Sequence, residues 1–280
     1  MNEETRQLFE DGFCLFRNVF DQNLITQLRT VTDRLLDAES TEEQARKRYQ
    51  GSSISVRYQD PVFGELIGWP GSLEALAHLG FEDAKYWTGY ILSKVPHGPP
   101  LYWHQDWIFW DDPISVEPDP RQLFLMIYLV DTNVFNGCLR VIPGTHRRRI
   151  SLHDRLVAAH GEEAQQASED SDMFATLPGE VNVEVKAGDL VIGDSRVLHA
   201  AHGNQSDYRR TCITLWYHPL FERFPDSIKQ NLVTSVDHVD VPDDTAPPDL
   251  ASRLRRLKPR FEGVAEPRDW VRTPTEHFPA

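Results

Sequence analysis

The central part of the chain consists of short apolar runs separated by turn residues. Each run has the length and the β-branched or aromatic content of a strand. The six runs are residues 85–95, 101–110, 122–131, 138–144, 181–194 and 209–219. Strands at this density are typical of a sandwich or barrel rather than of βαβ units. The sequence therefore predicts a mostly β fold.

The strand-like runs are flanked by segments of different character. We expect a single domain over residues 1–280, because β barrels of this length are often undivided. A segment of helices and one short strand is expected over 1–52, and the barrel core over 85–219. A polar, helix-prone insertion interrupts the core at 151–172, and a proline-rich, charged extension covers 220–280. Both are candidates for a lid over the barrel or for an interface.

Composition narrows the class of protein. The net charge of -14 offers no electrostatic attraction for nucleic acid or an anionic membrane, so we expect neither as a partner. The three cysteines, Cys14, Cys138 and Cys212, are scattered, which argues against a disulfide framework and for a reducing compartment. The N-terminus is acidic and polar, unlike a signal peptide. A cytoplasmic protein with a small-molecule substrate is expected, and the oligomeric state is left open.

Residues 104–106 form a His-x-Asp motif within an apolar run. On a strand, residues two apart point to the same face, so His104 and Asp106 are expected to project into one interior. The motif alone is weak, because the chain has a second copy at His238 and Asp240. That copy lies in a polar, loop-like segment, which favours a structural or solvent-exposed role for it.

A second histidine ligand is expected from a distant strand. His199 follows a Gly-Asp turn and a hydrophobic run, which would place it near a strand end inside a barrel. Its rival, His202, precedes a turn-like Gly-Asn-Gln-Ser segment and is expected to leave the sheet. Two imidazoles and one carboxylate form the facial triad that holds non-haem Fe(II) and leaves positions open. The sequence therefore predicts an iron site at His104, Asp106 and His199.

An arginine follows His199 by eleven residues. In the run 209–217, period-two alternation places Arg210 on one face together with Cys212, Thr214 and Trp216. A guanidinium that points into a barrel is costly unless it is paired, and a carboxylate is its natural bidentate partner. The plainer alternative is that Arg209 or Arg210 ends the strand at the surface.

At four places the chain resembles the phytanoyl-CoA dioxygenase family of Fe(II)- and 2-oxoglutarate-dependent oxygenases. The matching stretches are residues 9–21, 94–106, 136–147 and 188–210. The family's last motif spaces histidine, asparagine, serine or threonine, and arginine at fixed intervals, found here as His199, Asn204, Ser206 and Arg210. The family commonly has Gly-Ser after the histidine, whereas this chain has Ala200 and Ala201, so a hydroxyl that often helps to hold the co-substrate is missing.

The resemblance implies a double-stranded β-helix with flanking α-helices, and Fe(II), 2-oxoglutarate and O2 as cofactor and co-substrates. It implies that His104, Asp106 and His199 bind the metal. Four other positions match co-substrate contacts in the family, namely Arg210, Gln105, Tyr90 and Met126. The implied reaction is hydroxylation of an unactivated C–H bond, with succinate and CO2 as co-products. Related halogenases lack the carboxylate ligand, so Asp106 favours hydroxylation over halogenation.

Three alternatives stay open at the level of the sequence. One is a catalytically silent barrel that binds a ligand without turnover. Another is an acyl-CoA substrate, which the acidic composition disfavours. The third is a Zn(II) hydrolase with the same ligands, although two histidines, one aspartate and a nearby arginine suit iron better.

Overall fold

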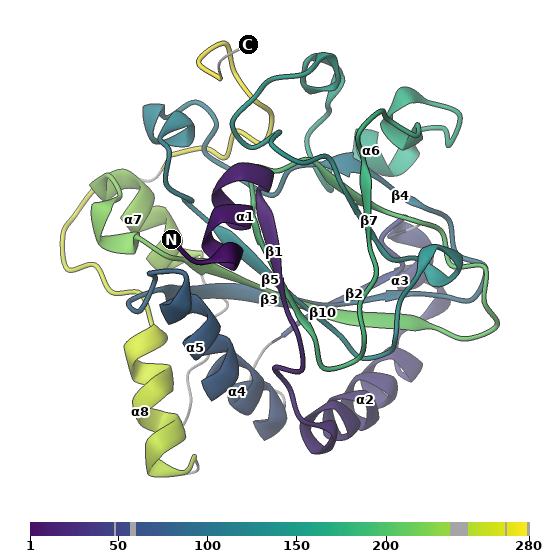
Figure 1. The fold of residues 1–280 in the computed structure, drawn as a ribbon, viewed down its shortest axis with the longest axis horizontal. Coiled ribbons are helices and arrows are strands. Elements are labelled where there is room, and N and C mark those ends of the chain that lie inside the picture. The colour runs from purple at the N-terminus through teal and green to yellow at the C-terminus, as the bar shows by residue number, and fades with distance from the viewer. Residues whose placement is uncertain (48, 57–59, 236–245, 267, 279–280) are drawn as a thin grey trace.

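The computed structural model describes residues 1–280 except 48, 57–59, 236–245, 267 and 279–280. Two antiparallel sheets form the centre of the described part and face each other as a flattened barrel (Figure 1). In spatial order, the larger sheet consists of β1 (Phe13–Phe16), β8 (Leu190–Asp194), β5 (Leu123–Tyr128), β10 (Arg210–His218), β3 (Lys85–Lys94) and β2 (Ser52–Ser55). The smaller sheet consists of β4 (Leu101–His104), β9 (His199–Ala201), β6 (Leu139–Val141) and β7 (Val181–Val183). The prediction of a mostly β fold is confirmed.

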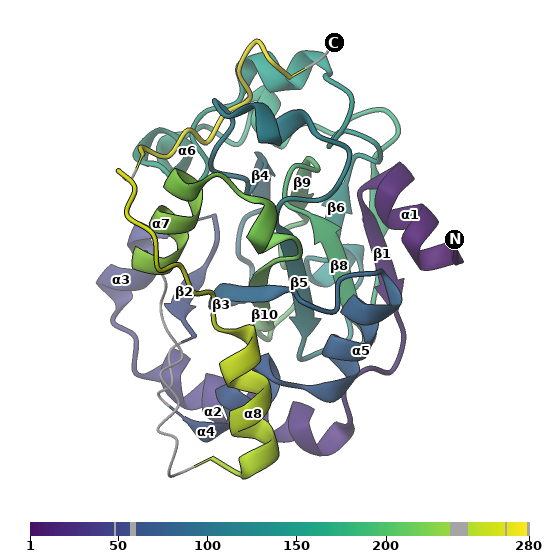
Figure 2. The same ribbon diagram turned by 90° about the vertical axis from the view of Figure 1, so that its left-hand side faces the viewer.

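Helices pack around this barrel. The α-helices are α1 (Glu3–Asp11), α2 (Gln22–Asp37), α3 (Thr41–Arg46), α4 (Pro61–Ile67), α5 (Pro70–His78), α6 (Glu162–Gln166), α7 (Asp226–Thr234) and α8 (Pro248–Leu257). The 3-10 helices are η1 (Pro113–Val116), η2 (Val134–Asn136), η3 (Ser151–Arg155), η4 (Asp172–Phe174) and η5 (Phe221–Arg223). Helices α2, α4, α5 and α8 cover the outer face of the larger sheet (Figures 1 and 2).

Strand β10 shows how alternation along the chain produces the two faces of the larger sheet. Its even-numbered side chains line the cavity between the sheets, namely Arg210, Cys212, Thr214 and Trp216. Its odd-numbered side chains Ile213, Leu215 and Tyr217 are buried in the core beneath the helices. Each such apolar side chain contributes about 1.5–3 kcal/mol by leaving water. The core therefore holds β10 in the register that directs Arg210 into the barrel.

The run 101–110, expected to be one strand, is a strand only as far as His104. After His104 the backbone changes partner, because the amides of Asp106 and Trp107 both donate to the carbonyl of Ser195, at 2.8 and 3.0 Å. Asp106 therefore enters the site from an extended segment held by the turn after β8. His104 and Asp106 both face the cavity, as strand alternation predicts. For Asp106, however, the cause is the pairing with Ser195 and not a continuation of β4.

The run 181–194 also differs from the expectation, because it divides between the two sheets as β7 and β8. Gly188 lies at the turn between them with φ of +100°. A Cβ there would stand 2.8 Å from the carbonyl oxygen of Phe20. Both the left-handed backbone and this close approach require glycine. Strand β9 was not among the expected strands, because its three residues are too few to show a period.

The two segments expected outside the core contain short elements. The insertion at 151–172 contains η3 and α6, and η4 begins at its end. The extension after 219 contains η5, α7 and α8, and its last part returns to the barrel, where Val271 bridges Phe109 in parallel register. In the described part of the chain, no helix is both long enough and apolar enough to cross a membrane.

Candidate active site

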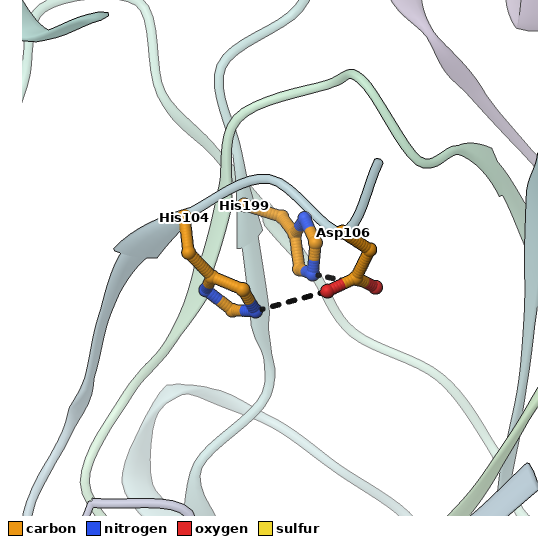
Figure 3. Close-up of side chains that lie close together, drawn as sticks. All are labelled: His104, Asp106 and His199. Carbon is orange, nitrogen blue, oxygen red and sulfur yellow. Dashed lines mark ion pairs between the residues drawn. The ribbon is translucent and has the colours of Figure 1, made fainter. Parts of the chain in front are cut away.

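Three side chains predicted as metal ligands converge between the sheets. His104 ends β4, His199 begins β9, and the two residues are register partners in the smaller sheet. One ligand atom of each, together with a carboxylate oxygen of Asp106, forms a group within 4.8 Å of one another (Figure 3). The Nε2 atoms of His104 and His199 lie 3.5 and 3.6 Å from the two oxygens of Asp106. All three residues are buried.

Backbone carbonyls orient both imidazoles in the same way. The Nδ1 of His104 lies 3.0 Å from the carbonyl oxygen of Tyr102, and the Nδ1 of His199 lies 3.1 Å from that of Val197. A carbonyl can only accept, so each Nδ1 carries the proton and each Nε2 presents a lone pair. Burial lowers the pKa of both histidines, which keeps them neutral and ready to coordinate a metal. The donor set therefore fits a divalent cation.

Asp106 is held as a carboxylate. The indole Nε1 of Trp216, on β10, donates to its Oδ2 at 3.0 Å and so connects the larger sheet to the metal site. Burial acts to raise the pKa of Asp106, but His199, His160 and His104 together lower it below its usual value. An ionised, oriented carboxylate beside two neutral imidazoles is the donor set that non-haem iron takes.

Geometry separates His199 from its rival. His202 lies outside the cavity, where its Nε2 is 2.7 Å from Oδ1 of Asn182. The second His-x-Asp copy, at His238 and Asp240, lies outside the described residues. The structure thus assembles the first motif with His199 and leaves His202 on the outer side of the smaller sheet.

A third imidazole near the site was missed by sequence reasoning. The Nε2 of His160 lies 3.6 Å from Oδ1 of Asp106, and its ring centroid lies 4.9 Å from that of His104. Its Nδ1 is 2.6 Å from Nε2 of Gln50, and its side chain is partly exposed. His160 stands in the loop before α6 with φ of +63°. It thus brings the insertion to the mouth of the metal site, a placement for which the sequence has no local signal.

Arg210 is buried without a carboxylate partner. The residue is 4% exposed, its Nη1 lies 3.3 Å from Sγ of Cys212, and its guanidinium carbon lies 5.5 Å from the ring centre of Tyr128. Within the described structure its Nε has no hydrogen-bond partner. An unsatisfied guanidinium is costly inside a protein, so this geometry calls for an anionic ligand. The alternative that Arg210 ends the strand at the surface is wrong.

Lys94 supplies a second buried cation at the same end of the cavity. It is the register partner of Arg210 on β3, and its Nζ donates to the carbonyls of Tyr49 at 3.0 Å and Pro99 at 2.6 Å. An ammonium has three donors, so one remains for a ligand. Burial, and then repulsion from Arg210, lower the pKa of Lys94 well below its usual value. A bound dianion would favour its charged form. The stretch 94–106 contained Lys94, but only the register of β3 and β10 shows its role.

The loop that leads into β10 explains the Asn and Ser of the last motif. Asn204 donates from Nδ2 to the carbonyls of Val95 and Tyr208, at 3.0 and 2.8 Å. Ser206 donates to Oδ1 of Asn204 at 2.6 Å. Neither residue lines the cavity in the described structure. Their contacts instead hold the turn that delivers Arg210 to the barrel.

The remaining expected co-substrate contacts fall in two groups. Tyr90 on β3 and Met126 on β5 line the cavity that contains the triad and Arg210, which has a volume of about 560 Å³. Gln105 does not line that cavity in the described part of the chain, and its amide donates to the carbonyl of Arg196. The residue between two that face inward points away from the interior. The orientation of Gln105 therefore does not support a contact with the co-substrate.

The model of the phytanoyl-CoA dioxygenase (PhyH) family matches residues 8–212, a range that contains the three predicted metal ligands and Arg210. The chain belongs to the phytanoyl-CoA dioxygenase family. It is accordingly a non-haem iron, 2-oxoglutarate-dependent dioxygenase, with O2 as the second co-substrate. Both the iron and the 2-oxo acid fit the residues present, because the triad offers two imidazoles and a carboxylate and because Nε of Arg210 has no hydrogen-bond partner in the described structure.

Individual relatives agree with this assignment. The chain is 26% identical to an ectoine dioxygenase of Nocardia farcinica over 76% of each chain. It is 31% identical to the mouse phytanoyl-CoA dioxygenase domain-containing protein 1, over 58% of this chain and 54% of that one. Among solved structures, the carbocyclase SnoK of nogalamycin biosynthesis shares the fold with a TM-score of 0.58 and 22% identity, over 78% of this chain and 83% of that one. HygX of Streptomyces hygroscopicus shares it with a TM-score of 0.59 and 18% identity, over 79% and 88%. The fold is therefore the predicted double-stranded β-helix.

Proposed function

We propose that this enzyme hydroxylates an unactivated C–H bond of a small-molecule metabolite. One oxygen atom of O2 enters the new hydroxyl group, and the other enters succinate as 2-oxoglutarate loses CO2. The observation that carries the proposal is the placement of Arg210 and Lys94, two buried basic side chains that line the same cavity as the triad. The relatives include enzymes named for ectoine and for hypophosphite, which supports a small substrate.

The chain's own residues have separate tasks in this reaction. His104, Asp106 and His199 would hold the metal through two imidazole nitrogens and a carboxylate, and all three residues line the cavity. Arg210 pairs with the far carboxylate of 2-oxoglutarate, and Lys94 adds a second positive charge there. Bound together, the iron and the 2-oxo acid supply the oxidising power. Tyr90 and Met126 form part of the wall of the same cavity.

The protein also has to exclude water and keep the metal's carboxylate in place. Trp216 lines the cavity, and its N–H fixes the carboxylate of Asp106. Asp106 would be the carboxylate ligand that related halogenases lack, which supports hydroxylation. The ring of Phe124 packs against the imidazole of His199, with 5.0 Å between the ring centroids.

The test requires no knowledge of the substrate. Under anaerobic conditions, Fe(II) and then 2-oxoglutarate are added to the metal-free protein, and the visible spectrum is recorded. We expect a weak metal-to-ligand charge-transfer band that is absent with Zn(II), and its loss in His199→Ala but not in His202→Ala. A folded protein that binds Fe(II) and shows no band would instead be the silent barrel or the zinc enzyme. Substrate screening with detection of succinate then tests the hydroxylation.

A further inference from the structure

The cavity has a second cationic end, formed by one residue of the C-terminal extension. Arg272 lines the cavity together with Trp87 and Trp270, on the side of Trp216. Arg210 and Trp216 stand six positions apart on β10, so their Cα atoms are about 20 Å apart. The predicted metal site lies near Trp216, because the indole N–H of Trp216 donates to Asp106. A 2-oxo acid that chelates the metal and reaches Arg210 leaves the Arg272 end free.

Hydrogen bonds of the preceding residue, Val271, fix the backbone at Arg272. The amide of Val271 donates to the carbonyl of Ile108 at 2.9 Å, and the amide of Trp110 donates to the carbonyl of Val271 at 3.1 Å. Arg268 forms ion pairs with Asp111 and Asp112. The chain around Val271 is thus attached to the segment that follows Asp106. Figure 2 shows the yellow trace of this C-terminal extension running past α7.

An aromatic ring orients the guanidinium itself. Its carbon lies 4.9 Å from the ring centre of Trp270, which in turn packs edge-on against Trp87 at 6.2 Å. Burial lowers the pKa of Arg272, and the Asp106 carboxylate opposes this shift, so the guanidinium lies within electrostatic range of the metal site. An arginine keeps its charge under such shifts. The group is therefore a preorganised cation at the mouth of the cavity.

Arg272 is partly buried, and unlike the buried Arg196 and Arg140 it has no carboxylate partner in the described structure. Arg196 pairs with Asp194 at 2.6 Å, and Arg140 pairs with Glu180 at 2.7 Å. Within the described residues, Arg272 has no ion pair and no hydrogen bond to a protein acceptor. A guanidinium stacked on one ring still has five N–H donors to satisfy. A carboxylate from outside the chain is the partner that matches them in charge and in geometry.

The walls around Arg272 are mainly aromatic, with Thr88 and Ser235 as polar members. Trp87, Trp216, Trp270 and Ile108 surround this part of the cavity, and Tyr90 packs edge-on against Trp216 at 6.0 Å. Trp270 is 44% exposed, so part of this wall is uncovered in the described structure. Large aromatic side chains bind a flat or apolar ligand most favourably, because such a ligand buries most of their surface. The opposite side offers polar groups of His160 and Gln50.

We propose that the substrate is an organic acid whose carboxylate is bound by Arg272 and whose aromatic or aliphatic body lies between the tryptophans, over the metal. This inference rests on the proposed function, because it uses the same cavity. Arg272 then acts as a specificity-determining residue. It positions a carbon of the substrate at the metal by holding the opposite end of the molecule.

The experiment measures binding rather than turnover. The anaerobic complex with Fe(II) and 2-oxoglutarate is titrated by calorimetry with matched probes. The acids are benzoate, phenylacetate, 3-phenylpropionate, 4-phenylbutyrate and indole-3-acetate, and each is paired with its primary amide. We expect at least one acid to bind about tenfold or more tightly than its amide, the value of one charge-assisted contact. Arg272→Gln should abolish this preference, and Arg272→Lys should restore part of it.

The controls separate this inference from the function on which it rests. Arg148→Gln removes an exposed guanidinium outside the cavity and should leave the acid preference unchanged. The charge-transfer band of wild-type protein tests the proposed function, and it should persist in Arg272→Gln. Three results would overturn the inference while that function stands. They are no acid preferred over its amide, an unchanged preference in Arg272→Gln, or loss of the band in Arg272→Gln, which would assign Arg272 to 2-oxoglutarate.

Discussion

Two neighbouring arginines have opposite surroundings at the start of β10. Arg209 lies near the surface and pairs with Asp37 at 2.6 Å and Asp33 at 3.6 Å. Arg210 is turned into the barrel, where a guanidinium nitrogen has no partner in the described structure. An arginine is thus a surface ion-pair donor at position 209 and a proposed ligand-binding group at position 210, because a shift of one residue along a strand moves a side chain to the other face.

This pair allows a matched test of co-substrate binding. Arg210→Gln should weaken 2-oxoglutarate binding by about 10- to 100-fold, the value of a charge-assisted bidentate pair, and should leave Fe(II) affinity nearly unchanged. Arg209→Gln, its control, should change neither, because exposed ion pairs contribute little. Titration of the anaerobic charge-transfer band measures both affinities. Equal 2-oxoglutarate affinity in Arg210→Gln and wild type would remove Arg210 from the site.

A second test at the residue scale asks whether His160, the third imidazole near Asp106, is a metal ligand. His160 approaches Asp106 as closely as His199 does, but the group of mutually close ligand atoms does not include it. We expect His160→Gln to keep Fe(II) affinity within about threefold, whereas His199→Gln should lower it by more than about 100-fold, beyond the usual effect of an outer-shell change. Equilibrium metal binding measures the difference. A comparable loss in both variants would make His160 a fourth ligand.

At the scale of elements, the turn at Gly137 packs against Lys94 and Arg210, the residues proposed to bind 2-oxoglutarate. Gly137 follows η2 with φ of +95° and precedes β6. A Cβ at this position would stand 3.0 Å from the carbonyl oxygen of His202, 3.2 Å from Cδ of Lys94 and 3.6 Å from Nε of Arg210. The turn, the lysine and the arginine are therefore packed as a unit, although they come from three separate stretches of the chain.

Substitution of this glycine tests that coupling. Gly137→Ala should lower both the free energy of unfolding and the affinity for 2-oxoglutarate, because the new methyl group displaces Lys94. Gly179→Ala is the control, since its φ is +81° and nothing lies within 4 Å of the added Cβ. It should cost only the left-handed backbone strain, about 1–2 kcal/mol, with 2-oxoglutarate affinity retained. Chemical denaturation and the charge-transfer titration measure the two effects. Unchanged 2-oxoglutarate affinity in Gly137→Ala would show that the turn is independent of the site.

At the scale of the whole molecule, buried neutral histidines link stability to pH. Burial lowers the pKa of His153 and of His218 to about 4. His218, at the end of β10, donates from Nδ1 to the carbonyl of Arg121 and packs against Trp87 and Phe224. Neither residue belongs to the metal site. Both must gain a proton when the chain unfolds in mild acid.

The sign of the effect follows from the two pKa values. The unfolded histidine has a pKa of about 6.5, so between pH 6.5 and 4 the unfolded state binds more protons and stability falls as pH falls. Each residue should cost on the order of 2 kcal/mol between pH 7 and pH 5. Denaturant titrations of metal-free protein at both pH values, with His218→Gln for comparison, measure this. The variant should lose less stability than wild type over that range, and an equal loss would mean that His218 is protonated in the folded state.

Much of the architecture was predictable because it depends on local periodicity. The alternation along 209–217 predicts which side chains of β10 face inward, and the structure confirms it. Two errors came from contacts that no local pattern encodes. β4 ends at His104 because Ser195 takes the next amides, and the run 181–194 divides because Gly188 turns the chain towards the other sheet.

By itself, the sequence determined the class of fold and the chemical nature of the site. Period-two hydrophobicity is a property of a single strand, and the spacing of His199 and Arg210 belongs to one short stretch of the sequence, so both can be read without the rest of the chain. Only the tertiary structure decided which further groups meet there. Lys94, His160 and Arg272 reach the cavity from a neighbouring strand, an insertion and the C-terminal extension. Their proximity depends on the packing of segments that are distant in sequence, and no residue pattern within any one segment specifies it.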